Sequence, residues 1–328
     1  MQPFNYVAVT QQQQAVDAIS ANPAAAFLAG GTNLIDEMKL NLQTPRQLVD
    51  INALPMANIE RSPDGGLRIG AMVRNSDLAW NDDVRQRYPL LSEALLSGAS
   101  PQLRNMASTG GNLLQHTRCY YFRDVSSPCN MRQPGSGCSA IDGYNRIHAV
   151  LGTSDKCIAT HPSDMCVALV ALEATIHIVG PHGERDVPIN EFYVAYGDDP
   201  AKLNVLNRDE LITYVALPAM PWAKRSHYLK VRDRASYEFA LASAAVALDL
   251  DGRTIREARI ALGGVATKPW RAVEAERRLA GQKAGDALFQ AAADDALQSA
   301  KPQKFNAFKI ELAKRTIFKA LQDTAAMG

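Results

Sequence analysis

Apolar and polar residues alternate over short segments in the first 110 residues, and stretches with helical spacing separate these segments. Alternating or small apolar residues predict strands at Phe4–Val9, Ala24–Ala29, Leu48–Ile51 and Leu67–Gly70. Helical spacing of apolar residues predicts helices after Thr10, near Ser76 and at Leu90–Leu96. This mixture of strands and helices is typical of a layered α/β or α+β fold.

Two of these helices carry capping signals at their expected starts. Thr10 and Gln13 resemble a capping box, followed by the apolar positions Ala15 and Ile19. Ser76 is a residue type that is favoured at a helix N-cap. We therefore expect these two helices to begin at Thr10 and Ser76 or just after them.

The apolar periodicity disappears between Gln115 and Cys157. This stretch is rich in Gly, Pro, Ser, Asn and Asp, and it is longer than loops normally are inside a compact domain. We expect such a segment to be either disordered or pinned by a bound group or a cross-link. The cysteines that it contains favour pinning.

Regular patterns resume at Ser163 and Asp164, either of which would cap a helix with an apolar face. Strands are predicted at Thr175–Val179, Arg185–Val187, Glu210–Leu217, His227–Arg232, Ala240–Leu250 and Ile255–Leu262. Helices are predicted at Ala272–Leu279, Asp286–Ser299 and Phe305–Leu321, after a linker at Pro218–Pro221. We expect a small C-terminal sheet that is covered by helices.

Composition narrows the class of protein. The chain of 328 residues is long enough for two domains, and its apolar fraction of 47% and charged fraction of 21% are ordinary for a soluble globular protein. A net charge of +1 gives no overall field that would favour nucleic acid or an anionic membrane. No apolar run predicts a membrane span, and Met1–Tyr6 does not resemble a secretory signal. On these features alone we expect a cytoplasmic protein.

Two glycine turns have nearly the same order of residue types. Gly30-Gly31-Thr32-Asn33-Leu34 follows an apolar strand, and Gly110-Gly111-Asn112-Leu113 follows Ser108-Thr109. Glycine lets a phosphate approach backbone N–H groups closely, and a dinucleotide has two phosphates to bind. One such turn is often only a tight turn, but the pair favours a diphosphate site. Neither turn is a G-x-G-x-x-G or P-loop fingerprint, which disfavours nicotinamide and nucleoside triphosphates.

Four of the five cysteines lie in the irregular stretch, at Cys119, Cys129, Cys138 and Cys157. Their wide intervals do not match the close pairs of zinc ribbons or bacterial ferredoxins. Residue types alone leave four interpretations open: small core residues, two disulfides, one zinc ion, or a [4Fe–4S] cluster. A polar loop without a core disfavours the first of these. Cys166 lies on an apolar helical face and is expected to be a buried small residue.

A series of segments, taken in order, carries a family resemblance. These segments are Ala29–Leu34, Leu67–Ala71, Ala107–Asn112, Pro162–Asp164, Asp209–Ile212 and Lys230–Arg232. Their order resembles the FAD-binding medium subunits of the molybdenum hydroxylases, the family of xanthine dehydrogenase and carbon monoxide dehydrogenase. The local sequence around the cysteines is most similar to that of the flavin and iron–sulfur subunit of periplasmic aldehyde oxidoreductases. It includes Thr117-Arg118-Cys119 and Cys157–Met165.

The resemblance implies a fold and a division into domains. It implies an α+β fold, with a two-lobed FAD-binding domain of the vanillyl-alcohol-oxidase/PCMH type and a small C-terminal α/β domain. The FAD-binding domain would span 1–220, with lobes at 1–60 and 61–220 and a cysteine-bearing insertion at 115–160. The C-terminal domain would span 224–328 and contain a three-stranded antiparallel sheet with helices.

The resemblance also implies the cofactors and the residues that hold them. The first glycine segment would bind the FAD diphosphate through Ala26, Phe27, Leu28, Ala29, Gly30, Gly31, Thr32, Asn33 and Leu34. The second wall of that site would be Ser108, Thr109, Gly111 and Asn112. Asp164 would accept a hydrogen bond from a cofactor hydroxyl, Ile212 would pack on the flavin edge, and Lys230 would reach the flavin pyrimidine. The four cysteines of the insertion would bind a [4Fe–4S] cluster, and no catalytic residue is expected on this chain.

The implied function is electron transfer within a larger assembly. A large molybdenum-cofactor subunit and a small [2Fe–2S] subunit would complete a heterotrimer or its multiple, and electrons would leave to an external acceptor. The resemblance implies a periplasmic protein co-exported with a signal-bearing partner, whereas a partner without a signal would leave it in the cytoplasm. Two rival functions remain: the flavin subunit of a 4-hydroxybenzoyl-CoA reductase, and a zinc-stabilised nucleotide-binding module without a redox role.

Overall fold

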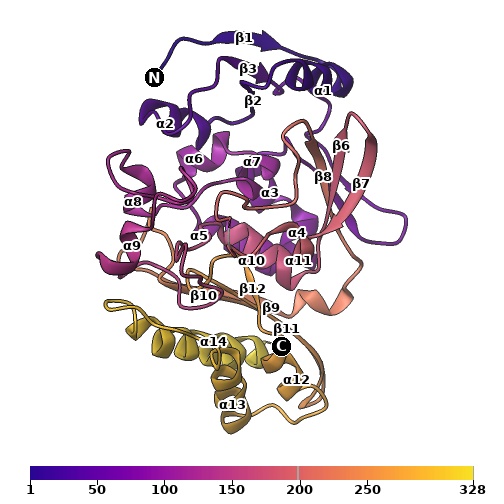
Figure 1. Cartoon of the computed structure of the whole chain (residues 1–328). Coiled ribbons are helices and arrows are strands. Elements are labelled where there is room, and N and C mark those ends of the chain that lie inside the picture. The colour runs from indigo at the N-terminus through magenta and orange to yellow at the C-terminus, as the bar shows by residue number, and fades with distance from the viewer. Residues whose placement is uncertain (198, 328) are drawn as a thin grey trace.

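The computed structural model describes residues 1–197 and 199–327. Three sheets follow one another along the chain, and Figure 1 shows them stacked from the N-terminal end of the molecule to the C-terminal helices. Each sheet has its own buried apolar cluster, and a fourth cluster lies around the cysteines. The mixture of strands and helices that the apolar periodicity predicts is thus confirmed.

The N-terminal sheet is small and parallel. Its elements are β1 (Asn5–Ala8), α1 (Gln12–Ala21), β2 (Ala25–Leu28), α2 (Leu34–Lys39) and β3 (Gln47–Asp50). The strand order is β1-β3-β2, and α1 buries Ala15 and Ile19 against the sheet. The predicted capping box is wrong, because α1 begins at Gln12 and its N-cap residue, Gln11, makes no side-chain capping bond.

The second sheet has five antiparallel strands in the order β4-β5-β8-β6-β7. Its strands are β4 (Ile59–Arg61), β5 (Leu67–Gly70), β6 (Thr175–Gly180), β7 (Gly183–Pro188) and β8 (Leu211–Leu217). Helices α3 (Asn75–Trp80), α4 (Asp82–Arg87), α5 (Pro89–Ser97), α6 (Pro101–Met106), α7 (Thr109–Leu113), α10 (Asp164–Ala171) and α11 (Ile189–Phe192) accompany this sheet. The predicted cap at Ser76 is wrong by two positions, because Arg74 is the N-cap residue of α3.

The cysteine-bearing stretch is irregular, as its composition predicts, apart from two single-turn helices. These are α8 (Tyr120–Arg123) and α9 (Ser139–Asp142). Figure 1 shows both helices on one side of the molecule, beside the second sheet's helices and above α14. The stretch has its own apolar cluster, in which three of the cysteines are buried together with Phe122 and Ile158.

The C-terminal sheet has four antiparallel strands, not the three that the sequence predicts. The order is β12-β11-β10-β9, built from β9 (Ser226–Val231), β10 (Ala242–Asp251), β11 (Thr254–Gly263) and β12 (Trp270–Arg271). Strand β12 pairs Trp270 with Leu262 and follows directly after Pro269. A two-residue strand is too short to show alternation, so no periodicity predicts it.

Helices cover one face of this C-terminal sheet, and the domain that contains the second sheet packs on the other face. The covering helices are α12 (Val273–Leu279), α13 (Asp286–Ala296) and α14 (Phe308–Ala326), whereas the short helix η1 (Pro221–Lys224) contacts β10 together with α4 and α5. Figure 1 shows α12, α13 and α14 at the C-terminal end, and α14 packs on β9 and β10. From the opposite side, the fully buried helix α10 contacts β10 and β11 and joins the two domains.

Candidate functional site

The first glycine turn presents backbone donors that no described residue accepts from. It lies between β2 and α2, and Gly31 has a φ of +72°, a conformation that favours glycine. The N–H groups of residues 30–34 form no hydrogen bond with the described residues. The N–H groups of this turn fit a bound diphosphate, which accepts hydrogen bonds from several N–H groups at once. The buried Oδ1 of Asn33, which also has no partner among the described residues, is an acceptor and does not belong to this set of donors.

The second glycine turn differs, because its backbone donors are already used. The N–H of Thr109 donates to Val73 O at 2.9 Å, and that of Gly110 donates to Ala71 O at 2.8 Å. The N–H of Gly111 donates to the Ser108 hydroxyl at 3.2 Å, which caps α7. This turn therefore offers side chains rather than a row of free N–H groups to a ligand.

Contact between the two turns explains one glycine without any ligand. A Cβ at Gly30 would lie 2.0 Å from the carbonyl oxygen of Met106, just before the second turn. Real Cβ atoms essentially never approach another atom so closely. The double-glycine pattern thus combines a packing requirement at Gly30 with a conformational one at Gly31.

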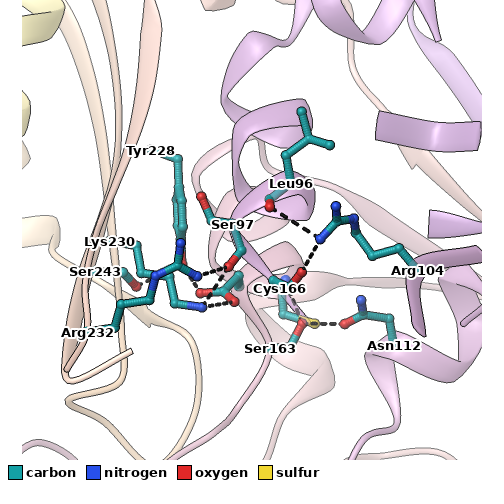
Figure 2. Close-up of polar contacts among 12 residues, drawn as sticks. Leu96, Ser97, Arg104, Asn112, Ser163, Cys166, Tyr228, Lys230, Arg232 and Ser243 are labelled. Carbon is teal, nitrogen blue, oxygen red and sulfur yellow. Dashed lines mark hydrogen bonds and ion pairs between the residues drawn. The ribbon is translucent and has the colours of Figure 1, made fainter. Parts of the chain in front are cut away.

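Asp164 and Lys230, for which the family resemblance implies separate contacts with a flavin, form an ion pair with each other. Lys230 Nζ lies 2.8 Å from Asp164 Oδ2 and donates at 3.0 Å to Ser97 O. The Tyr228 hydroxyl donates to Asp164 Oδ1 at 2.7 Å. Figure 2 shows Tyr228 and Lys230 of β9, and Arg232 immediately after this strand, directed toward Ser97 and the start of α10. This network crosses the junction of the two domains.

Burial makes this network costly to break. The side chains of Lys230 and Asp164 are only 3% and 9% exposed. Burial, followed by the charge of Asp164, raises the pKa of Tyr228 well above its usual value, so the phenol stays protonated and donates. A carboxylate has about four acceptor positions, so Asp164 retains capacity for a cofactor hydroxyl beside its two protein donors.

The other predicted flavin contacts lie in the neighbouring sheets. Ala26, Phe27 and Leu28 are half-buried in β2, where they pair with β3. Ile212 is buried in β8 and pairs with Ile178 of β6 next to a register shift. Asn112 Oδ1 accepts a hydrogen bond from Ser163 Oγ at 2.6 Å, which ties the second turn to the start of α10 (Figure 2). The roles of these residues on a cofactor stay predictions.

The four cysteines of the insertion line one pocket. Cys119, Cys129, Cys138 and Cys157 all face it, together with Thr117, Phe122 and Ala159. All five cysteines lie within the described residues and carry free thiols, and Cys166 is buried apart from this pocket in contact with Tyr193. Hydrogen bonds hold the loops in place, among them Asn130 Nδ2 to Lys156 O at 2.9 Å and Gly137 N to Asn130 Oδ1 at 2.9 Å.

The ionisation of these thiols depends on their mutual contacts. A hydrogen bond from the Cys157 thiol lowers the pKa of Cys138 to about 6 and raises the pKa of Cys157 itself. Burial raises the pKa of Cys119 to about 11. Without a bound cation the pocket thus favours a thiolate at Cys138 over one at Cys119, whereas metal binding requires deprotonated thiols.

The arrangement is not that of a site closed around a single metal ion. Among the described residues, no group of three or more His, Cys, Asp or Glu side chains has the geometry to hold an ion. A mononuclear zinc site would need four sulfurs about 2.3 Å from one point. The thiolates of a [4Fe–4S] cluster each bind a different iron and surround a larger body. The four free thiols that line one pocket match the number and kind of protein ligands that such a cluster takes.

Helix α2 joins the two candidate sites, a link that sequence reasoning missed. Asp36 Oδ2 accepts from Arg118 Nη1 and Arg123 Nη2, both at 2.8 Å, and these arginines flank Cys119. Although burial opposes its ionisation, hydrogen bonds from the two arginines lower the pKa of Asp36. The cysteine loop is therefore anchored on the helix that follows the first glycine turn.

The next residue of α2 makes a second anchor. Glu37 is fully buried and accepts hydrogen bonds from Asn33 Nδ2 at 3.0 Å and Gln43 Nε2 at 2.6 Å. Its carboxylate also lies 3.0 Å from Nδ1 of His116, at the start of the insertion. Burial opposes ionisation of Glu37, but the bond with His116 lowers its pKa. One buried carboxylate thus contacts both a predicted flavin residue and the cysteine segment.

Two family models match this chain. Residues 2–220 match the FAD binding domain in molybdopterin dehydrogenase, and residues 227–324 match the CO dehydrogenase flavoprotein C-terminal domain.

Among the helices of the described residues, none combines the length and the apolar character that a membrane span requires.

Individual relatives agree with these matches. The chain is 49% identical to the aldehyde oxidoreductase FAD-binding subunit PaoB of Escherichia coli, over 100% of both chains. It is 30% identical to the glyceraldehyde dehydrogenase medium chain of Sulfolobus acidocaldarius, over 98% of both. Among solved structures, carbon monoxide dehydrogenase from Hydrogenophaga pseudoflava superposes with a TM-score of 0.78 at 28% identity, over 99% of this chain and 98% of that one.

Proposed function

Because the chain belongs to the family of FAD-binding subunits of the molybdopterin dehydrogenases, we propose that it is the FAD- and [4Fe–4S]-binding electron-transfer subunit of a molybdenum-dependent aldehyde oxidoreductase. Family membership makes it an oxidoreductase subunit, and several relatives are named as subunits or medium chains of larger enzymes. The partners that we propose are a large molybdenum-cofactor subunit and a small [2Fe–2S] subunit. Electrons from these partners would leave through this chain to an external acceptor.

The observation that carries the proposal is that one chain holds two sets of groups, backbone N–H groups that suit a diphosphate and thiols that suit an iron–sulfur cluster. The free N–H groups of residues 30–34 suit a diphosphate, and four free thiols suit an iron–sulfur cluster. When bound, a [4Fe–4S] cluster would transfer electrons one at a time, and FAD would transfer them one at a time or in pairs. Helix α2 follows the first glycine turn and is bonded to the cysteine segment through Asp36 with Arg118 and Glu37 with His116.

The chain's own residues have binding and positioning tasks in this function. The ion pair of Asp164 with Lys230 places a carboxylate and an ammonium at the domain junction, shielded from water. Such buried charges are held at fixed positions, so they can favour one charge state of a bound flavin without reorganising. The chemical oxidation of an aldehyde would take place on a partner subunit.

Analysis of the purified chain and its complex tests the cofactor content. We expect one FAD, with about four iron and four acid-labile sulfide per chain. Zinc without iron or sulfide would instead support the zinc-stabilised nucleotide-binding module. Replacing Cys129 or Cys157 by Ser should reduce the iron content, whereas replacing Cys166 by Ser should leave it unchanged.

Assays of the complex test the reaction and its location. Turnover of aromatic aldehydes with an added acceptor would support the proposal, and activity only with hydroxybenzoyl-CoA would support the rival reductase. For localisation, we propose the periplasm, reached by export with a signal-bearing partner. Activity found only in the cytosolic fraction of intact cells would contradict that location without affecting the cofactor assignment.

A further inference from the structure

His148 lies against one of the four insertion cysteines. Its Nε2 is 3.1 Å from Cys119 Sγ, within hydrogen-bonding distance for sulfur. The His148 side chain is almost fully buried, with a relative exposure of 1% for the residue, and Cys119 is also buried. No sequence motif singles out this contact, since the two residues are 29 positions apart.

The backbone around His148 is held from the C-terminal domain. Asn306 Nδ2 donates to His148 O at 3.2 Å and to Ala149 O at 3.1 Å. Lys309 Nζ donates to His148 O at 3.0 Å and to Ile147 O at 3.0 Å. Asn306 and Lys309 are themselves fully buried, so these bonds are shielded from solvent. The position of the imidazole is thereby fixed more firmly than that of an ordinary loop side chain.

The contact determines which ring nitrogen carries the proton once Cys119 binds a metal. A ligating cysteine is a thiolate and has no proton to donate. A hydrogen bond between Cys119 Sγ and Nε2 of His148 therefore requires the hydrogen on Nε2. The buried Nδ1 has no partner among the described residues, and a hydrogen there would be an unsatisfied buried donor. Both considerations favour the same tautomer.

Resting on the proposed [4Fe–4S] site, we propose that His148 is a positioning residue that donates an Nε2–H hydrogen bond to the Cys119 thiolate and thereby raises the reduction potential of the cluster. Hydrogen bonds to cluster sulfurs are among the determinants of its potential. The reduced cluster carries one more negative charge than the oxidised one, and a charge-assisted donor stabilises it more strongly. The C-terminal domain would thus influence the redox properties of a cluster bound by the other domain.

The test compares three histidine variants in the complete complex. His148→Phe removes the donor, His148→Gln keeps an amide N–H at a similar reach, and His182→Phe changes an exposed histidine in the β6–β7 turn. The midpoint potential of the cluster is measured by redox titration followed by electron paramagnetic resonance, with iron and sulfide determined for each sample. We expect a more negative midpoint for His148→Phe, recovery toward the parent value for His148→Gln, and no change for His182→Phe.

A measurement on the unsubstituted protein covers the case in which His148→Phe does not assemble. With ¹⁵N-labelled histidine, the reduced cluster should show a hyperfine coupling to one imidazole nitrogen. A full complement of iron with an unchanged midpoint in His148→Phe, or the absence of that coupling, would overturn the role of His148. The absence of iron and sulfide from the parent complex would instead overturn the proposed cluster itself.

Discussion

Replacing Gly30 by Ala tests how closely the two glycine turns must approach each other. The added Cβ would lie 2.0 Å from Met106 O and 2.7 Å from Met106 C, and both are backbone atoms that cannot rotate away. Reaching a separation of 3.0 Å from the carbonyl oxygen requires the two segments to move apart by at least 1.0 Å (3.0 − 2.0). The turn would therefore open at the position where free N–H groups are presented.

The expected loss of stability follows from the nature of the collision. Overpacking in a well-packed region costs about 1–3 kcal/mol, and a clash with backbone belongs at the upper end of that range. In a domain of this size each kcal/mol lowers Tm by about 2–4 °C. A cost of about 3 kcal/mol thus corresponds to a fall in Tm of about 6–12 °C.

Gly285 offers a matched control for the same substitution. Its φ is 176°, an extended conformation open to any residue, and the nearest atom to an added Cβ is 3.9 Å away. Thermal unfolding should be recorded for Gly30→Ala, Gly285→Ala and the parent, with and without excess FAD, together with the bound flavin per chain. We expect a lower Tm and a lower flavin content only for Gly30→Ala. If Gly30→Ala retains the parent Tm and flavin content, the close approach of the two turns is not a constraint and the reasoning fails.

Further substitutions test three charged side chains, Lys230, Asp36 and Lys309, through the contacts that they make. Lys230→Met leaves Asp164 without its cation, which should lower the free energy of unfolding by about 3–5 kcal/mol in urea titrations, and adding Asp164→Asn should restore part of the loss. Asp36→Asn removes the negative charge that pairs with Arg118 and Arg123 and should reduce the iron content. Because the pKa of Asp36 is lowered in the fold, its contribution to stability is present above its usual pKa and is lost as pH falls through the lowered value. Burial lowers the pKa of Lys309 from 10.5 to about 7, so the unfolded chain binds more protons between these values and stability should rise with pH there. Lys309→Met should flatten this rise in urea titrations, and an unaltered pH profile would contradict the assignment.

Local pattern predicted most of the regular elements. The hairpin of β6 and β7, the long strands β10 and β11 and the helices with apolar faces all have several residues of consistent periodicity. The missed elements are short, such as β4, β12 and α7, where two to five residues cannot establish a period. Of the two cap residues that the sequence leaves open, Ser163 and Asp164, the structure has Ser163, whose hydroxyl accepts from Cys166 N.

The candidate site was predictable as a set of residues but not as a set of contacts. Glycines and cysteines have distinctive chemistry that is visible in the sequence, whereas the ion pair of Asp164 with Lys230 joins residues 66 positions apart. The contact of Asp36 with Arg118 spans 82 positions and also follows no period. Only the folded chain brings such pairs together, because their separation is set by packing of whole elements rather than by local spacing.

Because Lys309 bonds to the cysteine segment, protein engineering must change the start of α14 and that segment together. Two of the carbonyl oxygens that accept from its ammonium, on Ile147 and His148, belong to the 115–160 segment, and the third belongs to Gly264. A shortened version lacking that segment would leave the Lys309 amine with only one of these three acceptors, so its design requires a different side chain at this position. Conversely, grafting the segment onto a homologous scaffold requires transplanting Lys309 and Asn306 with it.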